Sequence, residues 1–273
     1  RGHCIIERRI ARFGIDCDLK RGHLETAMKP SHLTQLEAMH DEAVARGMGD
    51  EVQLLDESGT RELLQSPIYI GALRNNRNLH LHPLKLCLGE ARAAATLGVC
   101  IHEQTPVTDI RHGDRPVVVT ATGDVHAAAV VLAGDVYHRL GGARMAGLIF
   151  PAMGAIVTTE PLGALAQEIN PQDLAVYDCR FVLDYHRLTA DRRLLFGGGC
   201  HYSGRDSRDP AAELRPAIEA TFPALKGVRI DHGWTCAMGI VMNRIPQLGR
   251  LGPHIWYAQG YSGHGIATSH IVG

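Results

Sequence analysis

The sequence has little that would commit it to a secreted, membrane-bound or nucleic-acid-binding protein. Its seven cysteines are an odd number without a Cys-x-x-Cys pair, which indicates reduced thiols in the cytoplasm rather than a disulfide framework. No apolar run approaches the ~18 residues of a membrane span, and charges interrupt the N-terminal residues where a signal peptide would need an apolar run. A formal net charge of −1 gives no sign of a nucleic-acid partner. The 273 residues are 45% hydrophobic and 21% charged, which is typical of a globular protein with one large or two moderate domains.

Both ends of the sequence are abrupt. It begins with Arg1 rather than Met, just before an expected helix, and ends at Gly273, where another helix has only begun. We therefore expect a fragment of a longer protein. The sequence leaves the oligomeric state open.

Helical and strand-like patterns alternate along the chain. Apolar residues at helical spacing, with stops at Gly14 and Gly98, predict helices over 5–13, 31–46 (with Ser31 as N-cap), 56–64, 83–97 and 211–221. Apolar runs between turn residues predict strands over 52–55, 68–73, 99–103, 155–160, 181–188, 194–200, 228–234 and 255–258. Three further strands, 107–111, 117–121 and 125–133, are split by glycine turns and predict a β-meander.

These patterns predict an α/β (α+β) fold with two discontinuous domains. One is a partial Rossmann-like domain made of residues 1–14, 81–140 and 246–273. The other is a β-rich antiparallel substrate domain made of residues 15–80 and 141–245. The all-apolar run 130–133 suits a strand covered on both faces, and ligands gather at the carboxyl ends of such strands.

The C-terminal stretch 255–273 is the most informative part of the chain. Its apolar strand runs into a helix through Gly260, Gly263 and Gly265. Such a turn leaves free backbone N–H groups at the helix N-terminus, where phosphates and electron-rich rings bind. Because glycines also serve such turns merely through their positive φ, the pattern alone leaves both interpretations open.

Short motifs spread over nearly the whole chain carry a family resemblance. They include Leu81-His-Pro-Leu-Lys-Leu-Cys, Val130-Val-Leu-Ala-Gly, Asp184-Tyr-His-Arg-Leu, Leu195-Phe-Gly-Gly-Gly and Gly260-Tyr-Ser-Gly-His-Gly. The chain thereby resembles the D-amino-acid-oxidase-type FAD-dependent oxidoreductases (the glycine oxidase and sarcosine oxidase superfamily), and within them the gamma-glutamylputrescine oxidase branch. The resemblance implies FAD as cofactor. The family's Gly-x-Gly-x-x-Gly segment for the FAD pyrophosphate is absent here, so we expect this chain alone to bind FAD poorly.

The resemblance also implies which residues contact the cofactor. Val107 matches the position that contacts the adenine. The carried-over positions along the rest of the cofactor are Ala133 and Gly134, where it approaches the chain, and Gly260, Ser262, Gly263, His264 and Gly265 beside the flavin. A helix N-terminus at this turn would stabilise negative charge on the reduced ring.

The substrate side departs from the amino-acid-oxidising relatives. They carry Trp-x-x-x-Arg on the strand before the turn, and the arginine binds the substrate carboxylate. Here the pattern begins at Trp234 and has Met238 in place of that arginine, which favours an amine over an α-amino acid. Arg244 is a weaker substitute. Cys236 lies near the position of the cysteine that bonds covalently to flavin in sarcosine-oxidase relatives. The gamma-glutamylputrescine oxidase branch lacks that cysteine, so a covalent bond between Cys236 and flavin is the less favoured alternative.

Several side chains keep two interpretations. His264 has the position for a catalytic role, and local packing is the alternative. Tyr261 and Trp234 either wall the substrate pocket or belong to the core. We interpret the strand with Tyr185 and Arg187 as a solvated face. His80 and His82 share a strand face, but no third ligand stands at useful spacing, so we expect no metal.

The predicted function is oxidation of a C–N bond in a small-molecule amine resembling gamma-glutamylputrescine, as in polyamine degradation. Hydride passes from the carbon to flavin, the imine hydrolyses to an aldehyde, and hydrogen peroxide forms if O2 is the acceptor. One alternative is an oxidase or dehydrogenase of an amino acid of the D-amino acid, sarcosine, glycine or proline type. The other is a non-catalytic remnant that has lost FAD.

Overall fold

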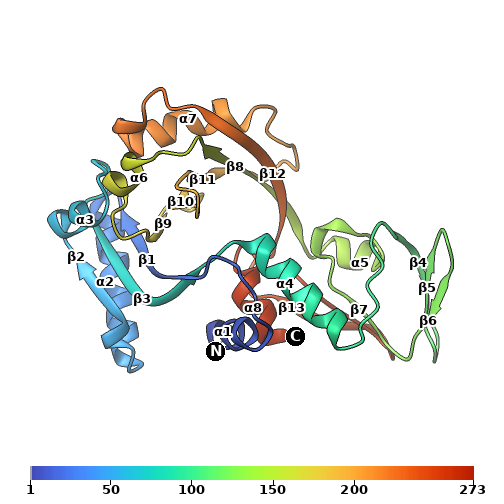
Figure 1. Ribbon diagram of the computed structural model, residues 1–273. Coiled ribbons are helices and arrows are strands. Elements are labelled where there is room, and N and C mark those ends of the chain that lie inside the picture. The colour runs from blue at the N-terminus through green and yellow to red at the C-terminus, as the bar shows by residue number, and fades with distance from the viewer. Residues whose placement is uncertain (1) are drawn as a thin grey trace.

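A computed structural model of the chain describes residues 2–273, without the side chains of Ala143 and Arg144. The chain forms a large curved sheet, two small sheets and a set of helices (Figure 1). Within the described residues no helix is long and apolar enough to cross a bilayer.

The large sheet has eight strands. Their order is β12 (Ile230–Ile240), β8 (Phe150–Thr159), β11 (Leu194–His201), β10 (Tyr185–Leu188), β9 (Ala175–Asp178), β1 (Lys20–Ala27), β3 (Gly71–His80) and β2 (Val52–Leu55). All neighbours are antiparallel except β1 and β9, which run parallel. This one parallel pair joins the segments 15–80 and 141–245 into a single sheet, as the predicted substrate domain requires. The domain boundaries themselves stay a prediction.

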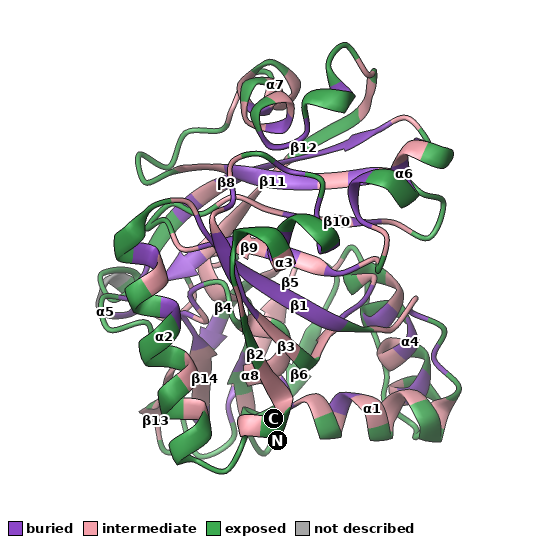
Figure 2. Ribbon diagram, turned by 90° about the vertical axis from the view of Figure 1, so that its left-hand side faces the viewer, coloured by how far each residue is buried: buried purple, intermediate pink, exposed green. Residues whose placement is uncertain are grey.

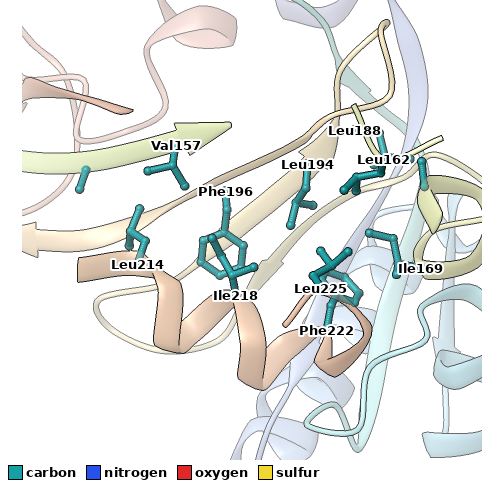
Figure 3. Packing of buried hydrophobic residues seen from close by; sticks show 12 residues of the cluster. Val157, Leu162, Ile169, Leu188, Leu194, Phe196, Leu214, Ile218, Phe222 and Leu225 are labelled. Atoms are coloured by element: carbon teal, nitrogen blue, oxygen red, sulfur yellow. The ribbon is translucent and has the colours of Figure 1, made fainter. Parts of the chain in front are cut away.

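Helices cover one face of this sheet. α7 (Pro210–Thr221) and α6 (Ala164–Ile169) enclose the largest core cluster, in which Phe196 of β11 packs among Ile218, Phe222 and Leu225 (Figure 3). α3 (Glu57–Leu63), capped by Asp56 as its sequence predicts, closes a second cluster around Leu24. Burial of these apolar side chains supplies the main driving force for this half of the molecule.

The opposite face of the large sheet, here called the inner face, has a different character. The strand register places one row of side chains across it: Trp234, Ile156, Gly197, Tyr185, Tyr177 and Glu25. α2 (Pro30–Ala45) covers this face only at the β1–β3 end, where Leu36 packs on Ala27 and Leu73. Strands β1 and β8 of this sheet are largely buried, whereas β2, most of β12 and the outward side of α2 are not (Figure 2).

The remaining elements form the layer that faces the inner side of the arch (Figure 1). β7 (Val130–Leu132) and β14 (Ile255–Gln259) run parallel, with β13 (Gln247–Gly252) antiparallel to β14. β4 (Val107–Arg111), β5 (Val117–Thr120) and β6 (Asp124–His126) form the separate meander. The helices of this layer are α1 (Gly2–Phe13), α4 (Pro83–Thr96), α5 (Gly142–Ala146) and α8 (Gly265–Val272). An added Cβ on Gly2 would collide with the backbone of Ala267, so α1 and α8 are in close contact.

Three local predictions were wrong, and one strand was missed. Residues 99–103 form no strand, because no neighbouring strand pairs with them among the described residues, and Val99 and Ile101 stay exposed. Lys29 rather than Ser31 is the N-cap of α2. The segment 125–133 is split between β6 and β7 in different sheets, and β13 was not expected at all. The helices predicted at 56–64, 83–97 and 211–221 are confirmed within two residues.

Three buried histidines make the fold sensitive to acid. Burial lowers the pKa of His23 and His80 to about 4 and that of His186 to about 3, against an ordinary value near 6.5. The His186 ring and the Tyr69 hydroxyl form one hydrogen bond of 3.1 Å, and His186 stacks on Phe196. At mildly acidic pH these histidines are therefore protonated in the unfolded chain but stay neutral in the folded protein.

Stability should therefore be full above about pH 6.5 and fall as the pH drops toward 4. Each histidine would contribute a loss of up to about 2 kcal/mol at pH 5. Urea unfolding at pH 7.5 and pH 5 measures the difference. His23→Asn should flatten this dependence, whereas His112→Asn, in an exposed turn, should not. Equal urea midpoints at the two pH values would contradict the prediction.

Candidate active site

Two parallel strands end side by side at the candidate site. β7 and β14 pair in register up to Leu132 and Tyr257, so their carboxyl ends lie at one edge of the small sheet. After β7 the chain passes Ala133 and Gly134 into the short 3-10 helix η2 (Asp135–Tyr137), and after β14 it enters the glycine turn 260–265. The topology thus brings together two stretches that the sequence had marked separately.

Asp135 links these two strand ends to the large sheet. Its carboxylate accepts the backbone N–H of Gly260 at 2.7 Å and that of Gly239, at the end of β12, at 2.9 Å. Two residues later, the Tyr137 hydroxyl donates to the Ala237 carbonyl and accepts from the Ala237 N–H, both at 3.0 Å. Asp135 was not among the predicted site residues, although an acidic residue directly after an apolar strand is a sequence signal for a site.

Ser262 fixes the glycine turn from inside. Its hydroxyl accepts from the Val241 N–H at 3.1 Å and donates to the Gly260 carbonyl at 3.2 Å, while its own N–H donates to the Gly239 carbonyl. Gly260 and Gly263 both have positive φ, so only glycine fits them without strain. Of the predicted turn residues, Ser262 and Gly260 are buried and support the turn, and Gly263 is exposed.

The N-terminus of α8 is open. His264 is its N-cap, and no side chain accepts a hydrogen bond from the first N–H groups of the helix. An added Cβ on Gly263 would meet nothing within 4 Å, so there is free space beside this end. The His264 side chain is exposed there, and Gly265 begins the helix. Unpaired donors and the helix dipole together favour an electron-rich group at this point.

A cleft of about 600 Å³ runs along the segment after η2. Val107 and Asp109 of β4 line one side, and Tyr137, Arg139 and Leu140 line the other. A smaller cavity of about 90 Å³ shares His138 and Arg139 with it and reaches Asp135 and Gln259, next to the glycine turn. Val107 therefore lies in the same groove system as the strand ends. The exposed Ala133 and Gly134 do not line either space, although Gly134 lies close to the His138 ring.

The inner face carries the predicted substrate-side residues. Trp234, Cys236 and Met238 alternate along β12 toward that face, with Trp234 41% exposed and Met238 half-buried. Tyr185 lies over Gly197, where any side chain would collide with its ring. Burial, with the nearby thiols of Cys236 and Cys200, raises the pKa of Tyr185 to about 12.

The interpretation of Tyr185 and Arg187 as a solvated face was wrong. Both side chains are partly buried on the inner face, and burial lowers the pKa of Arg187. Cys200 reaches this face because the β11–β8 register shifts between Gly198 and His201, at the left-handed Gly199. Burial raises the pKa of Cys200 and of Cys236, so both thiols stay protonated near neutral pH.

His80 and His82 do not converge on one site. His80 bonds the Asp173 carbonyl at 3.0 Å, whereas His82 caps α4 by accepting the Lys85 N–H at 3.4 Å. The part of the chain that the structure describes contains no group of three side chains arranged to hold a metal ion.

A parallel strand pair that ends at an open glycine turn, faced by an antiparallel sheet, is the arrangement of a cofactor-dependent oxidoreductase. The family described as "FAD dependent oxidoreductase" matches residues 1–273, and the chain belongs to it.

Two curated relatives give the likeness in detail. The chain is 41% identical over 273 residues to gamma-glutamylputrescine oxidoreductase of Escherichia coli K12, and 37% identical over 275 residues to the probable oxidoreductase OrdL of Haemophilus influenzae. Each alignment covers 98% of this chain and 63% of the relative. The chain thus spans less than two thirds of the length of these relatives.

Solved structures share the fold. Glycine oxidase from Geobacillus kaustophilus superposes with a TM-score of 0.82 at 24% identity, covering 98% of this chain and 73% of that one. L-proline dehydrogenase from P. horikoshii superposes with a TM-score of 0.83 at 20% identity, covering 100% and 75%. At these identities the likeness concerns the fold. The predicted α/β (α+β) class is confirmed.

The residues present fit the flavin end of FAD. The uncapped start of α8, the open space at Gly263 and the adjoining groove provide donors and room for an electron-rich ring edge. No contact with a cofactor tests the individual assignments, so the cofactor-binding and substrate-binding residues stay predictions.

Replacing the Asp135 carboxylate should loosen the turn. Asp135→Asn keeps one acceptor oxygen but turns an NH2 group toward the second backbone N–H, so the free energy of unfolding should fall by about 1–3 kcal/mol. Urea unfolding measures this loss. Asp114→Asn, on the exposed β4–β5 turn, is the matched control. Equal stability of the two variants would refute the role of Asp135.

Proposed function

We propose that this chain is the flavin-facing and substrate-binding part of an FAD-dependent amine oxidoreductase that acts on a gamma-glutamylputrescine-like substrate. The 41% identity to gamma-glutamylputrescine oxidoreductase of Escherichia coli carries the proposal. Met238 adds to it, because its apolar side chain occupies the inner face where an α-amino acid would require a cation. A role in polyamine degradation in a reducing, cytoplasmic compartment agrees with seven free cysteines.

The glycine turn and α8 would hold the flavin. The free N–H groups of Gly265 and the residues after it would hold the ring edge on which negative charge grows, and the helix dipole would stabilise that charge. Asp135 and Ser262 keep the turn rigid, so its donors need no rearrangement during the reaction. Val107, Ala133 and Gly134 would contact the remainder of the cofactor.

The inner face would hold the amine. Bound FAD supplies the hydride acceptor for the carbon beside the amine nitrogen. Trp234, Met238 and Ile156 give this side of the site an apolar wall, which lowers the pKa of a bound ammonium and so favours the neutral amine. Only the neutral amine has the lone pair that assists hydride loss. The Tyr185 hydroxyl stays protonated and is a hydrogen-bond donor beside the wall.

His264 and Tyr261 would border the reacting atoms. His264 is exposed at the end of α8, with ring nitrogens free to accept the proton that leaves the amine. Burial, followed by the Asp135 carboxylate, raises the pKa of Tyr261, so its phenol stays a donor. Water then hydrolyses the imine to an aldehyde and releases ammonia, and O2 as electron acceptor would yield hydrogen peroxide.

A substrate panel tests the proposal. The full-length protein that contains this chain, purified and supplied with FAD, is assayed by dye reduction and by peroxide release with gamma-glutamylputrescine, putrescine, sarcosine, D-alanine, glycine and proline. We expect kcat/KM to be highest for gamma-glutamylputrescine. Preference for a free amino acid would favour an amino-acid oxidase instead. Absence of flavin absorbance and of turnover would favour a protein that does not use FAD.

Met238→Arg should change the substrate class. A guanidinium on the inner face would pair with an α-carboxylate and would raise the cost of bringing a cationic amine to the same place. We expect kcat/KM for gamma-glutamylputrescine to fall at least about 10-fold while D-alanine or sarcosine gains measurable turnover. Met238→Leu, which keeps the apolar volume, should stay within about 3-fold of the unmodified protein. Unchanged substrate selectivity in Met238→Arg would contradict the assignment of Met238 to the substrate site.

A further inference from the structure

Three exposed loops converge beside the inner face at Arg244. The Arg244 guanidinium lies over the Phe181 ring, 5.4 Å from its centroid, and its Nη2 donates to the Tyr202 hydroxyl at 3.4 Å. Phe181 comes from the β9–β10 loop, Tyr202 from the β11–α7 loop and Arg244 from the β12–β13 loop. Phe181 is 80% exposed and Tyr202 46%, although both are large aromatic residues. Aromatic side chains left this accessible mark a recognition surface.

The backbone of Arg244 adopts an energetically unfavourable conformation. Its φ of +60° is left-handed, a conformation that few non-glycine residues adopt, and its N–H closes a turn onto the Val241 carbonyl at 3.1 Å. Val241 in turn is tied to Ser262 and packs against Gly260. The loop that presents Arg244 is thereby anchored to the glycine turn.

The Arg244 guanidinium has N–H groups available to bind a further partner. No carboxylate lies within 4 Å of it among the residues that the structure describes, in contrast to Arg180 and Arg193, each of which bridges two aspartates. Burial raises the pKa of Cys200, and the nearby Arg244 guanidinium and Tyr202 hydroxyl offset only part of that rise. The cluster therefore lies close to Cys200, at the rim of the inner face. A planar cation with free N–H groups beside an aromatic ring suits a carboxylate.

We propose that Arg244, supported by Phe181 and Tyr202, binds the α-carboxylate at the far end of a gamma-glutamylated amine. The assignment rests on the proposed function and deepens it. In an α-amino acid the carboxylate adjoins the reacting carbon, which calls for a cation at the Met238 position. In a gamma-glutamylated amine the carboxylate lies at the opposite end of an extended molecule, which calls for a cation at the rim. The apolar Met238 and the rim Arg244 thus fit one substrate shape.

The test compares gamma-glutamylputrescine with its α-carboxamide, which lacks only the negative charge. Arg244→Gln should raise KM for the carboxylate substrate roughly 10- to 100-fold, the worth of a charge-assisted hydrogen-bonded pair, and leave kcat within about 2-fold. KM for the carboxamide should not change. Arg244→Lys should restore part of the affinity, because it keeps the charge without the planar fork.

Arg192→Gln is the matched control, because Arg192 is also an exposed arginine with left-handed φ, but in the β10–β11 hairpin. It should leave both substrates unaffected. Equal losses for the two substrates in Arg244→Gln, or no loss for either, would overturn the carboxylate subsite while leaving the amine oxidase proposal intact. All variants are made in the full-length protein that contains this chain. Failure of that unmodified protein to oxidise either compound would overturn the proposed function itself, and the subsite with it.

Discussion

One carboxylate holds the candidate site together. Asp135 accepts backbone N–H groups from Gly239 and Gly260, and so joins the ends of β7, β12 and β14 at one point. The first of these strands is followed by the small residues Ala133 and Gly134, the second belongs to the large sheet and the third leads into the glycine turn. Both donors are main-chain N–H groups of glycines: Gly260 has a positive φ, and a Cβ on Gly239 would collide with the Asp135 carboxylate. Asp135 and Ser262, which bonds the backbone of Gly239 and Val241, together fix the distance between the glycine turn and the end of β12.

Much of the architecture followed from local patterns. Helices 83–97 and 211–221 were predicted because their apolar spacing, first-turn prolines and stop residues agree. The turn between β14 and α8 was predicted because Gly260, Gly263 and Gly265 stand between an apolar strand and a helix. Each of these signals lies within a short stretch of sequence, so the sequence alone is enough to detect it. Strand 99–103 failed for the complementary reason: its apolar residues have strand character, but a strand exists only with a partner, and pairing is a property of the whole fold.

The parts of the site that were missed depend on long-range register. Tyr185 and Arg187 alternate with Asp184 and His186, and that pattern alone does not say which side is buried. Pairing of β10 with β9 and β11 turns His186 into the core and Tyr185 onto the inner face. Cys200 reaches the same face only through the irregularity at Gly199, which reverses the alternation. Arg244 was named from the sequence only as a weaker substitute for the missing arginine, whereas Phe181 and Tyr202 were missed, because the three residues come from separate loops that meet only in the fold.

The parallel pairing of β1 with β9 has a consequence for how this chain is made. The contact between Thr26 and Tyr177 spans 151 positions. During synthesis the β1–β3–β2 sheet can form early, but β1 remains an open edge until β9 has left the ribosome. An unpaired strand edge, with its free backbone N–H and C=O groups, is prone to pair with other chains. Production of this protein should thus be limited by the time β1 waits for its neighbour, and slower growth at lower temperature or chaperones that shield exposed strands should raise the soluble yield.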